Sequence, residues 1–266
     1  MLLDYGSLIS REPIKLSIGT IRKPTLSEVA EITFDKFLYY ESFLKMTPEI
    51  VYTQLYEKQG KEYWDSLSEE ERSAISIYKL ILSDSNLQQV YTDLFNFFFV
   101  EKVVFLEGYF VILNTDVNLK PDEINISDIH GIISSNSFVQ VLEVIQQTCF
   151  IYDKPKKSID ELKFKNDIAR KMYEKMLKAQ EEQDKRREKT YNKDHYLPNI
   201  ISAVSNRHPC LNPINIWELT VYQLIDSFNR LQVNAVYDIN QTRVSVWGDE
   251  KKTFDSSLWY KNNNDS

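Results

Sequence analysis

The side chains in this sequence that are best suited to bind a metal are His208 and Cys210, which stand in the stretch HPC. A structural zinc site takes about four ligands, which motifs such as C-x-x-C and H-x-x-H supply. His195 lies 13 residues before His208, Cys149 lies 61 residues before Cys210, and the sequence contains neither motif. A Cys–His nucleophile needs the two side chains to face each other beside an orienting third group, which adjacent loop positions do not favour. We therefore expect a loop that binds no metal and no cofactor.

Clustered carboxylates are the next candidates for chemistry, at Glu69–Glu71 and at Glu181–Glu182. Acidic residues in the first turn of a helix complement its dipole, and those in a highly charged helix are solvated, so both clusters are predicted to be structural. The sequence has no GxxxxGKS or GxxxxGKT phosphate loop and no GxGxxG motif, and its 6 glycines are scattered. These observations predict that the protein is not an enzyme.

A basic run at Lys185–Lys193, KRREKTYNK, is the stretch most suited to nucleic acid. The whole chain is acidic, with a formal net charge of −7 and a pI near 5.2. The segment from Lys154 to Asp194 holds 14 Lys and Arg against 9 Asp and Glu, a balance of +5 that leaves −12 for the remainder. Acidic residues dilute the run, so we interpret it first as a solvated helix end. Contact with an acidic protein partner is the second interpretation, and contact with nucleic acid is the least favoured.

Aromatic side chains are abundant, at 13% of residues, and they have two interpretations. The run FNFFF at Phe95–Phe99 and the helical stripe from Trp217 to Phe228 fit a hydrophobic core. Trp and Tyr near a polar terminus also fit a surface that binds another protein, because these residues dominate interface energetics. The candidate partner-binding residues are Trp217, Tyr222, Phe228, Tyr237, Trp247, Phe254, Trp259 and Tyr260.

Most of the elements that would position these residues are expected to be helices. Helix start signals appear as two Thr or Ser capping boxes, as a Thr followed by Pro, and as a Ser followed by three glutamates. They stand at Thr25–Glu28, Ser158–Glu161, Thr47–Pro48 and Ser68–Glu71. Apolar residues at helical spacing predict further helices over residues 83–99 and 135–152.

Two stretches are predicted to form β-structure instead. Ile14–Ile21 alternates apolar with small or polar residues, which is typical of a strand with one buried face. Residues 102–114 form two β-rich arms about Glu107 and Gly108, a plausible hairpin turn, and the first strand would complete a small sheet with them. The fold class is therefore mainly α: a helical bundle-like body with a small N-terminal or central sheet or hairpin, and a C-terminal helical module.

Composition divides the chain into three predicted segments. Residues 1–153 form the helical body, 154–198 a charged helical linker, and 199–266 the C-terminal module. The stripe of the C-terminal helix is expected to be chiefly core, while its surplus aromatics would face a partner. Residues 237–248 fit a strand or a helix, and both remain open.

The location of the protein is predicted from three absences in the sequence. Two cysteines are too few for a disulfide framework, and the N-terminus lacks the basic start and long apolar run of a signal peptide. No stretch approaches the roughly 20 apolar residues that span a bilayer. We expect a cytoplasmic protein that does not enter the membrane.

The C-terminal segment resembles the tail assembly chaperones of long-tailed (siphovirus-type) bacteriophages and prophages of Gram-positive bacteria. In that family a -LTVYQ-x-x-D-x-F-x-R- helix precedes an -AYD- segment and a closing aromatic tail with Lys and Asn. The matching positions here are Leu219–Gln223, Asp226, Phe228, Arg230, Ala235–Asp238 and Trp259–Asn262. The resemblance is close over about 50 residues and loose over the rest, including REPIKLSIGTIRKPTLSEV near the N-terminus.

The resemblance implies a non-enzymatic protein of the host cytoplasm that coats the tape-measure protein, recruits tail-tube subunits and leaves before the virion is complete. Self-association is a further open prediction. The main alternative is a structural or completion protein of the tail that stays in the particle. A small phage protein that handles nucleic acid through Lys185–Lys193 is the third hypothesis, and it predicts strongly salt-dependent binding.

Overall fold

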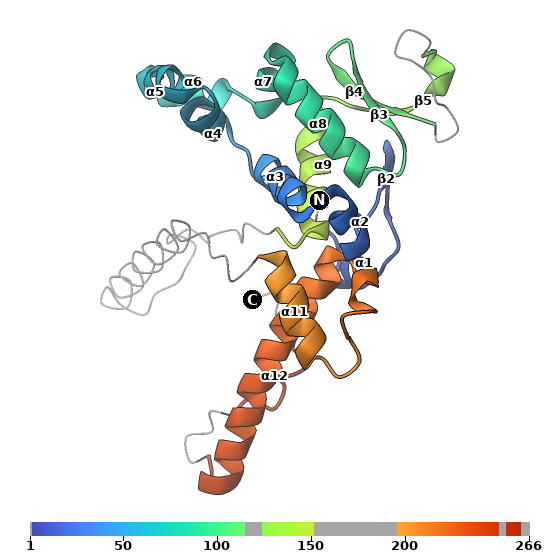
Figure 1. The fold of residues 1–266 in the computed structure, drawn as a ribbon. Coiled ribbons are helices and arrows are strands. Elements are labelled where there is room, and N and C mark those ends of the chain that lie inside the picture. Colours follow the sequence, from blue (N-terminus) through green and yellow to red (C-terminus); the bar gives the residue numbers. More distant parts are fainter. Residues whose placement is uncertain (1, 115–123, 152–195, 250–253, 262–266) are drawn as a thin grey trace. The chain divides into compact units, whose positions relative to one another are not determined.

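The computed structural model describes residues 2–114, 124–151, 196–249 and 254–261, and it is mainly α-helical with two small antiparallel sheets (Figure 1). The predicted fold class is therefore confirmed. The described residues divide into two compact units. Unit 1 holds those of Met1–Ile151 together with Trp217–Gln223, and unit 2 holds those of Tyr152–Ile216 and Leu224–Ser266. The capping box at Ser158–Glu161 and most of the predicted linker 154–198 lie outside the described residues, and the three predicted segments stay a prediction.

Several helices of unit 1 begin directly after a capping residue. Thr25 and Ser68 each form a complete capping box, and Thr47 accepts the Ile50 N–H ahead of Pro48, so these three start signals are confirmed. The helical elements are α1 (Tyr5–Ile9), α2 (Leu26–Ile32), α3 (Phe34–Leu44), α4 (Pro48–Ile50), the π-helix η1 (Val51–Leu55), α5 (Glu57–Ser66), α6 (Glu69–Ala74), α7 (Ile77–Ser83), α8 (Ser85–Phe98), the 3-10 helix η3 (Ile126–Asp128) and α9 (Ser135–Thr148).

The N-terminal β-structure is a hairpin, not the single strand that alternation predicts. β1 (Ile14–Leu16) and β2 (Gly19–Ile21) pair antiparallel across a two-residue turn. A tight turn preserves the alternation of buried and exposed residues on both sides, so the period alone does not distinguish a hairpin from one strand. β2 then continues beside the end of α8, where Val100 N–H donates to Thr20 O at 2.9 Å.

The second sheet has the order β3-β4-β5 and does not include the first hairpin, so the expectation of one joint sheet is wrong. β3 (Val103–Leu106) and β4 (Tyr109–Leu113) form the predicted hairpin, with φ of 49° at Glu107 and 84° at Gly108, the positive values that a type I′ turn requires. The third strand, β5 (Ile129–Ile133), was not predicted. Its Gly131 packs against the N-terminal hairpin, because a Cβ there would lie 2.1 Å from Ile18 O.

Aromatic rings fill the core of unit 1 between α8, α9 and the second sheet. Phe95 lies 4.9 Å from Phe110 and 6.0 Å from Phe138 between ring centroids, and Tyr91 lies 5.4 Å from Phe138. The buried Tyr91 hydroxyl donates to Phe43 O at 3.0 Å, which satisfies the one polar atom of that ring. Phe95, Phe98 and Phe99 are fully buried, so the core interpretation of FNFFF is confirmed for these three rings.

The regular elements in the described part of unit 2 are helices. They are α11 (Leu197–Arg207) and most of α12 (Val221–Trp247). In the sequence, the 3-10 helix η6 (Ile216–Glu218) includes the last residue before the Trp217–Gln223 segment of unit 1 and the first two residues of that segment. α12 continues through residues 237–247, which settles the open choice between strand and helix there (Figure 1). No helix in the described part of the chain is long and apolar enough to cross a membrane.

Candidate partner-binding surface

The start of α12 is fixed by two helix caps that pair with each other in unit 1. Thr25 at the start of α2 and Thr220 at the start of α12 form an antiparallel bridge. Leu26 N–H donates to Leu219 O at 2.9 Å, and Val221 N–H donates to Pro24 O at 3.1 Å. The two helices therefore begin at the same place in the structure.

Thr220 and Gln223 complete a capping box at the start of α12. Thr220 N–H donates to Gln223 Oε1 at 3.0 Å, and Gln223 N–H donates to Thr220 Oγ1 at 3.2 Å. The Gln223 amide also donates at 2.8 Å to the carbonyl oxygen of Ile9, the last residue of α1. The sequence LTVYQ is thus a capping segment that also closes unit 1.

Tyr222 belongs to this closure and not to the surface. Its side chain is fully buried, and its ring lies 5.0 Å from Phe150 and 6.5 Å from Tyr5 between centroids. A fully buried ring does not meet a partner unless the unit opens. The structure therefore gives Tyr222 a core position where the sequence analysis proposed partner binding.

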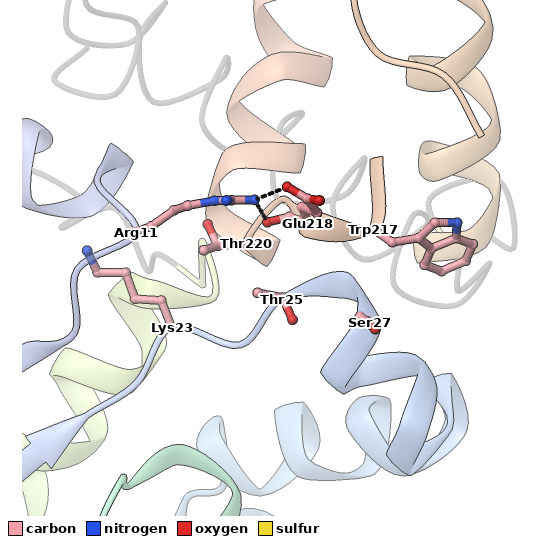
Figure 2. A pocket seen from close by; sticks show the side chains of 7 residues that line it. All are labelled: Arg11, Lys23, Thr25, Ser27, Trp217, Glu218 and Thr220. Carbon is pink, nitrogen blue, oxygen red and sulfur yellow. Dashed lines mark hydrogen bonds and ion pairs between the residues drawn. The ribbon is translucent and has the colours of Figure 1, made fainter. Parts of the chain in front are cut away.

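A surface hollow of about 330 Å³ lies beside the paired caps. Figure 2 shows Arg11 against Glu218, with an ion pair of 3.5 Å and a second bond to the Glu218 carbonyl, while the Trp217 indole extends away from this pair. Lys23 is buried, and its amine donates to the carbonyls of Ser7 and Ser10, the latter at 2.7 Å. Burial lowers the pKa of Lys23, and its two hydrogen bonds hold the end of α1.

The second half of α12 carries large apolar side chains in water. The exposed fractions are 51% for Val236, 69% for Ile239, 64% for Val246 and 77% for Trp247. Successive residues of an α-helix are 100° apart around its axis, and on this basis the four side chains fall within an arc of about 100°. They therefore form one stripe along the second half of α12. We call these four residues the α12 apolar face.

The other side of α12 contacts residues 254–261, which we call the closing segment. Tyr237 lies 5.4 Å from Phe254 between ring centroids, and Arg230 donates to Lys261 O at 2.7 Å. Lys261 in turn pairs with Asp255 at 3.6 Å. Tyr237 and Arg230 lie roughly 140° around the helix from the middle of the apolar face. The described residues of the closing segment therefore leave that face exposed.

The remaining predicted partner-binding residues fall into two groups. Trp259 and Tyr260 are exposed at the end of the closing segment, where their rings pack edge to face at 5.1 Å. Trp217, Phe228, Tyr237 and Phe254 are half-buried. Of the eight predicted residues, Trp247 alone lies on the α12 apolar face. Val236, Ile239 and Val246 were not predicted, although their spacing is helical, because the prediction rested on aromatic residues and because residues 237–248 fit both a strand and a helix.

Of the side chains first considered for chemistry, His208 has structural partners in the described part of the chain. His208 Nδ1 accepts the backbone N–H of Cys210 at 3.2 Å and of Leu211 at 3.1 Å. Burial raises the pKa of the Cys149 thiol well above its ordinary value. Glu69–Glu71 occupy the first turn of α6, as predicted. In the described part of the chain no cluster of three or more His, Cys, Asp or Glu could hold a metal. Glu181–Glu182, Lys185–Lys193 and His195 lie outside the described residues.

These features define a mainly α protein whose long C-terminal helix, α12, exposes one apolar face. Residues 186–264 match the family model described as the YomV second domain, and YomV is a Bacillus phage protein. The match suggests a phage-related protein and includes both the LTVYQ cap and the α12 apolar face. Neither the curated proteins nor the solved structures contain a match to the chain.

Proposed function

We propose that this protein is a tail assembly chaperone of a long-tailed phage or prophage. It binds the tape-measure protein and recruits tail-tube subunits in the host cytoplasm, without catalysis, and is absent from the mature virion. Two findings support the proposal: the phage-related family match over residues 186–264, and the resemblance of the segment from Leu219 to Asn262 to such chaperones. Both fall on the part of the chain that carries the open helix face.

The observation that carries the proposal is the α12 apolar face itself. Contiguous apolar side chains on the surface of a folded protein mark a site of interaction, because leaving them in water is unfavourable. The face is one helix wide, and a helix with apolar residues at i, i+3 and i+4 spacing suits it as a ligand. A long tape-measure helix offers such stripes repeatedly, and a chaperone must cover them reversibly.

The alternative is a structural or completion protein of the tail that remains in the particle. It would bury the same face permanently at a fixed copy number. The two functions differ in the composition of the finished virion, so purified particles distinguish them.

The test is a pull-down from infected or prophage-induced cells, with mass spectrometry of the eluate and of purified virions. We expect the wild-type bait to capture the tape-measure and tube proteins and the virions to lack this chain. An Ile239→Asp/Val246→Asp double variant should lose the capture. Asn234→Asp/Gln241→Glu is the matched control, since it adds the same charge at exposed positions on the opposite side of α12.

Each outcome bears on one of the two functions. If this chain is present in virions at a fixed copy number, the chaperone proposal fails and the structural alternative replaces it. If wild-type bait captures neither tail protein, the proposed partners are wrong.

A further inference from the structure

The α12 apolar face carries a positive charge, which restricts what the face can bind. Arg243 lies within the same arc of α12, between Ile239 and Val246, and is exposed. Its guanidinium makes no ion pair or side-chain hydrogen bond with the described part of the chain. No acidic residue falls within this arc between Gln232 and Trp247. The face therefore presents one positive charge among apolar groups.

A second copy of this chain would match the face poorly. Val236, Ile239, Arg243 and Val246 follow the 3-4-3 spacing of a heptad seam. In a parallel pair of α12 helices Arg243 would meet Arg243, which is a like-charge contact at the seam.

An antiparallel pair would place Val236 opposite Val246 and Arg243 opposite Ile239. Each copy would then press a charged group against an apolar side chain with no carboxylate nearby. Asp238 is the nearest acid on the helix, but it lies roughly 130° around the axis from the middle of the face. Both pairings leave Arg243 without an opposite charge, which is unfavourable when water is excluded.

We infer that the α12 apolar face binds an amphipathic helix of another protein, with a carboxylate of that helix opposite Arg243. This inference rests on the proposed function and adds to it the chemistry of the partner. Val236 and Trp247 are separated by about 16 Å along the axis, so the contact covers roughly three turns of the partner helix. Val236, Ile239, Val246 and Trp247 supply the binding energy, and Arg243 selects an acidic seam over a basic one.

The test uses two designed helical peptides of about three heptads that bear Leu at every a and d position. One carries Glu at the flanking e and g positions, and its twin carries Lys. Binding to the full-length protein is measured by fluorescence anisotropy at low and at physiological salt. We expect the Glu peptide to bind about tenfold more tightly than its Lys twin, with a smaller ratio at higher salt, since the flanking charges are solvent-exposed.

Two variants and one control variant test which side chains of α12 cause the binding and the preference. Arg243→Glu should reverse the preference between the peptides, because only the sign of the selecting charge has changed. Ile239→Asp/Val246→Asp should abolish binding of both peptides, whereas Asn234→Asp/Gln241→Glu should leave both affinities as they are. Circular dichroism of each variant checks that α-helix content is retained.

Three results with the peptides overturn the inference. They are no binding of the Glu peptide to the wild-type protein, equal binding of both peptides, and a preference that Arg243→Glu leaves unchanged. A dimer by analytical ultracentrifugation that Ile239→Asp/Val246→Asp dissolves also overturns it, because a second copy would then occupy the face. The peptides are independent of phage proteins, so their failure leaves the tape-measure capture standing, and failure of that capture leaves the peptide result standing.

Discussion

Glu41 is expected to make the stability of unit 1 depend on pH near neutrality. It lies in α3, half-buried, close to Cys149 at the end of α9. Burial raises the pKa of the Glu41 carboxyl from 4.5 to about 7, and the neighbouring Lys45 ammonium only partly opposes this shift. The Cys149 thiol stays protonated, because burial and the nearby Glu41 carboxylate both raise its pKa. Glu41 is thus protonated in the folded protein and ionised in the unfolded chain between pH 4.5 and about pH 7.

The sign of the effect follows from proton binding. Between the pKa of the unfolded chain, 4.5, and that of the folded protein, about 7, the folded protein holds more protons than the unfolded chain. Stability therefore falls as the pH rises through this window. The raised pKa corresponds to a loss of folding free energy of at most about 3.4 kcal/mol, which is absent below pH 4.5 and complete above pH 7. Partial exposure of the carboxyl to water reduces this figure.

The assay is urea unfolding at pH 5 and pH 8, followed by circular dichroism, for wild type and Glu41→Gln. The glutamine cannot ionise, so we expect the variant to be more stable than wild type at pH 8 by about 1–3 kcal/mol and nearly equal to it at pH 5. Glu31→Gln, at an exposed position of α2, is the matched control and should follow wild type at both pH values. Parallel pH dependence in wild type and Glu41→Gln would refute the reasoning.

Three further predictions concern the closure of unit 1. Thr220→Ala should lower the free energy of unfolding in urea by about 1 kcal/mol. The double variant Thr220→Ala/Gln223→Ala should lose less than the sum of the two single losses, because the two side chains form one reciprocal cap. Gly131→Ala should destabilise by about 2 kcal/mol or more, since its Cβ would lie 2.1 Å from Ile18 O; a neutral result would mean that the hairpin does not pack there. Tyr222→Ala should lower the unfolding free energy by about 3–5 kcal/mol. If the variant instead weakened partner binding without this loss of stability, the partner-binding interpretation of Tyr222 would replace the core interpretation.

Local signals in the sequence predicted the elements whose cause is local. The capping boxes at Thr25 and Ser68, the Glu107-Gly108 turn and the apolar spacing of α8 and α9 each depend on residues within a few positions of one another. A hydroxyl three residues before a glutamate, or two adjacent residues with positive φ, works in the same way wherever the chain places it. These predictions were therefore accurate.

Long-range pairing produced the misses. β5 is a strand because β4 lies beside it and because Gly131 leaves room for the Ile18 backbone, and neither fact is visible in IHGII. The burial of Tyr222 depends on Phe150 and Tyr5, which are distant in sequence. For the candidate surface, helical spacing could have placed Val236, Ile239 and Val246 together with Trp247. Whether that face or the Tyr237 face stays open depends on the closing segment, which no local pattern reveals.

The segment LTVYQ belongs both to the core of unit 1 and to the start of α12. It lies inside the family match of residues 186–264, yet its backbone and Tyr222 complete unit 1. Its cap pairs with that of Thr25, and the same residues begin the helix that ends in the α12 apolar face. A variant such as Thr220→Ala therefore perturbs the cap while leaving every residue of the apolar face in place. If it weakens unit 1 but not peptide binding, the face acts through its own side chains; if it weakens both, binding also requires the cap to hold the start of α12.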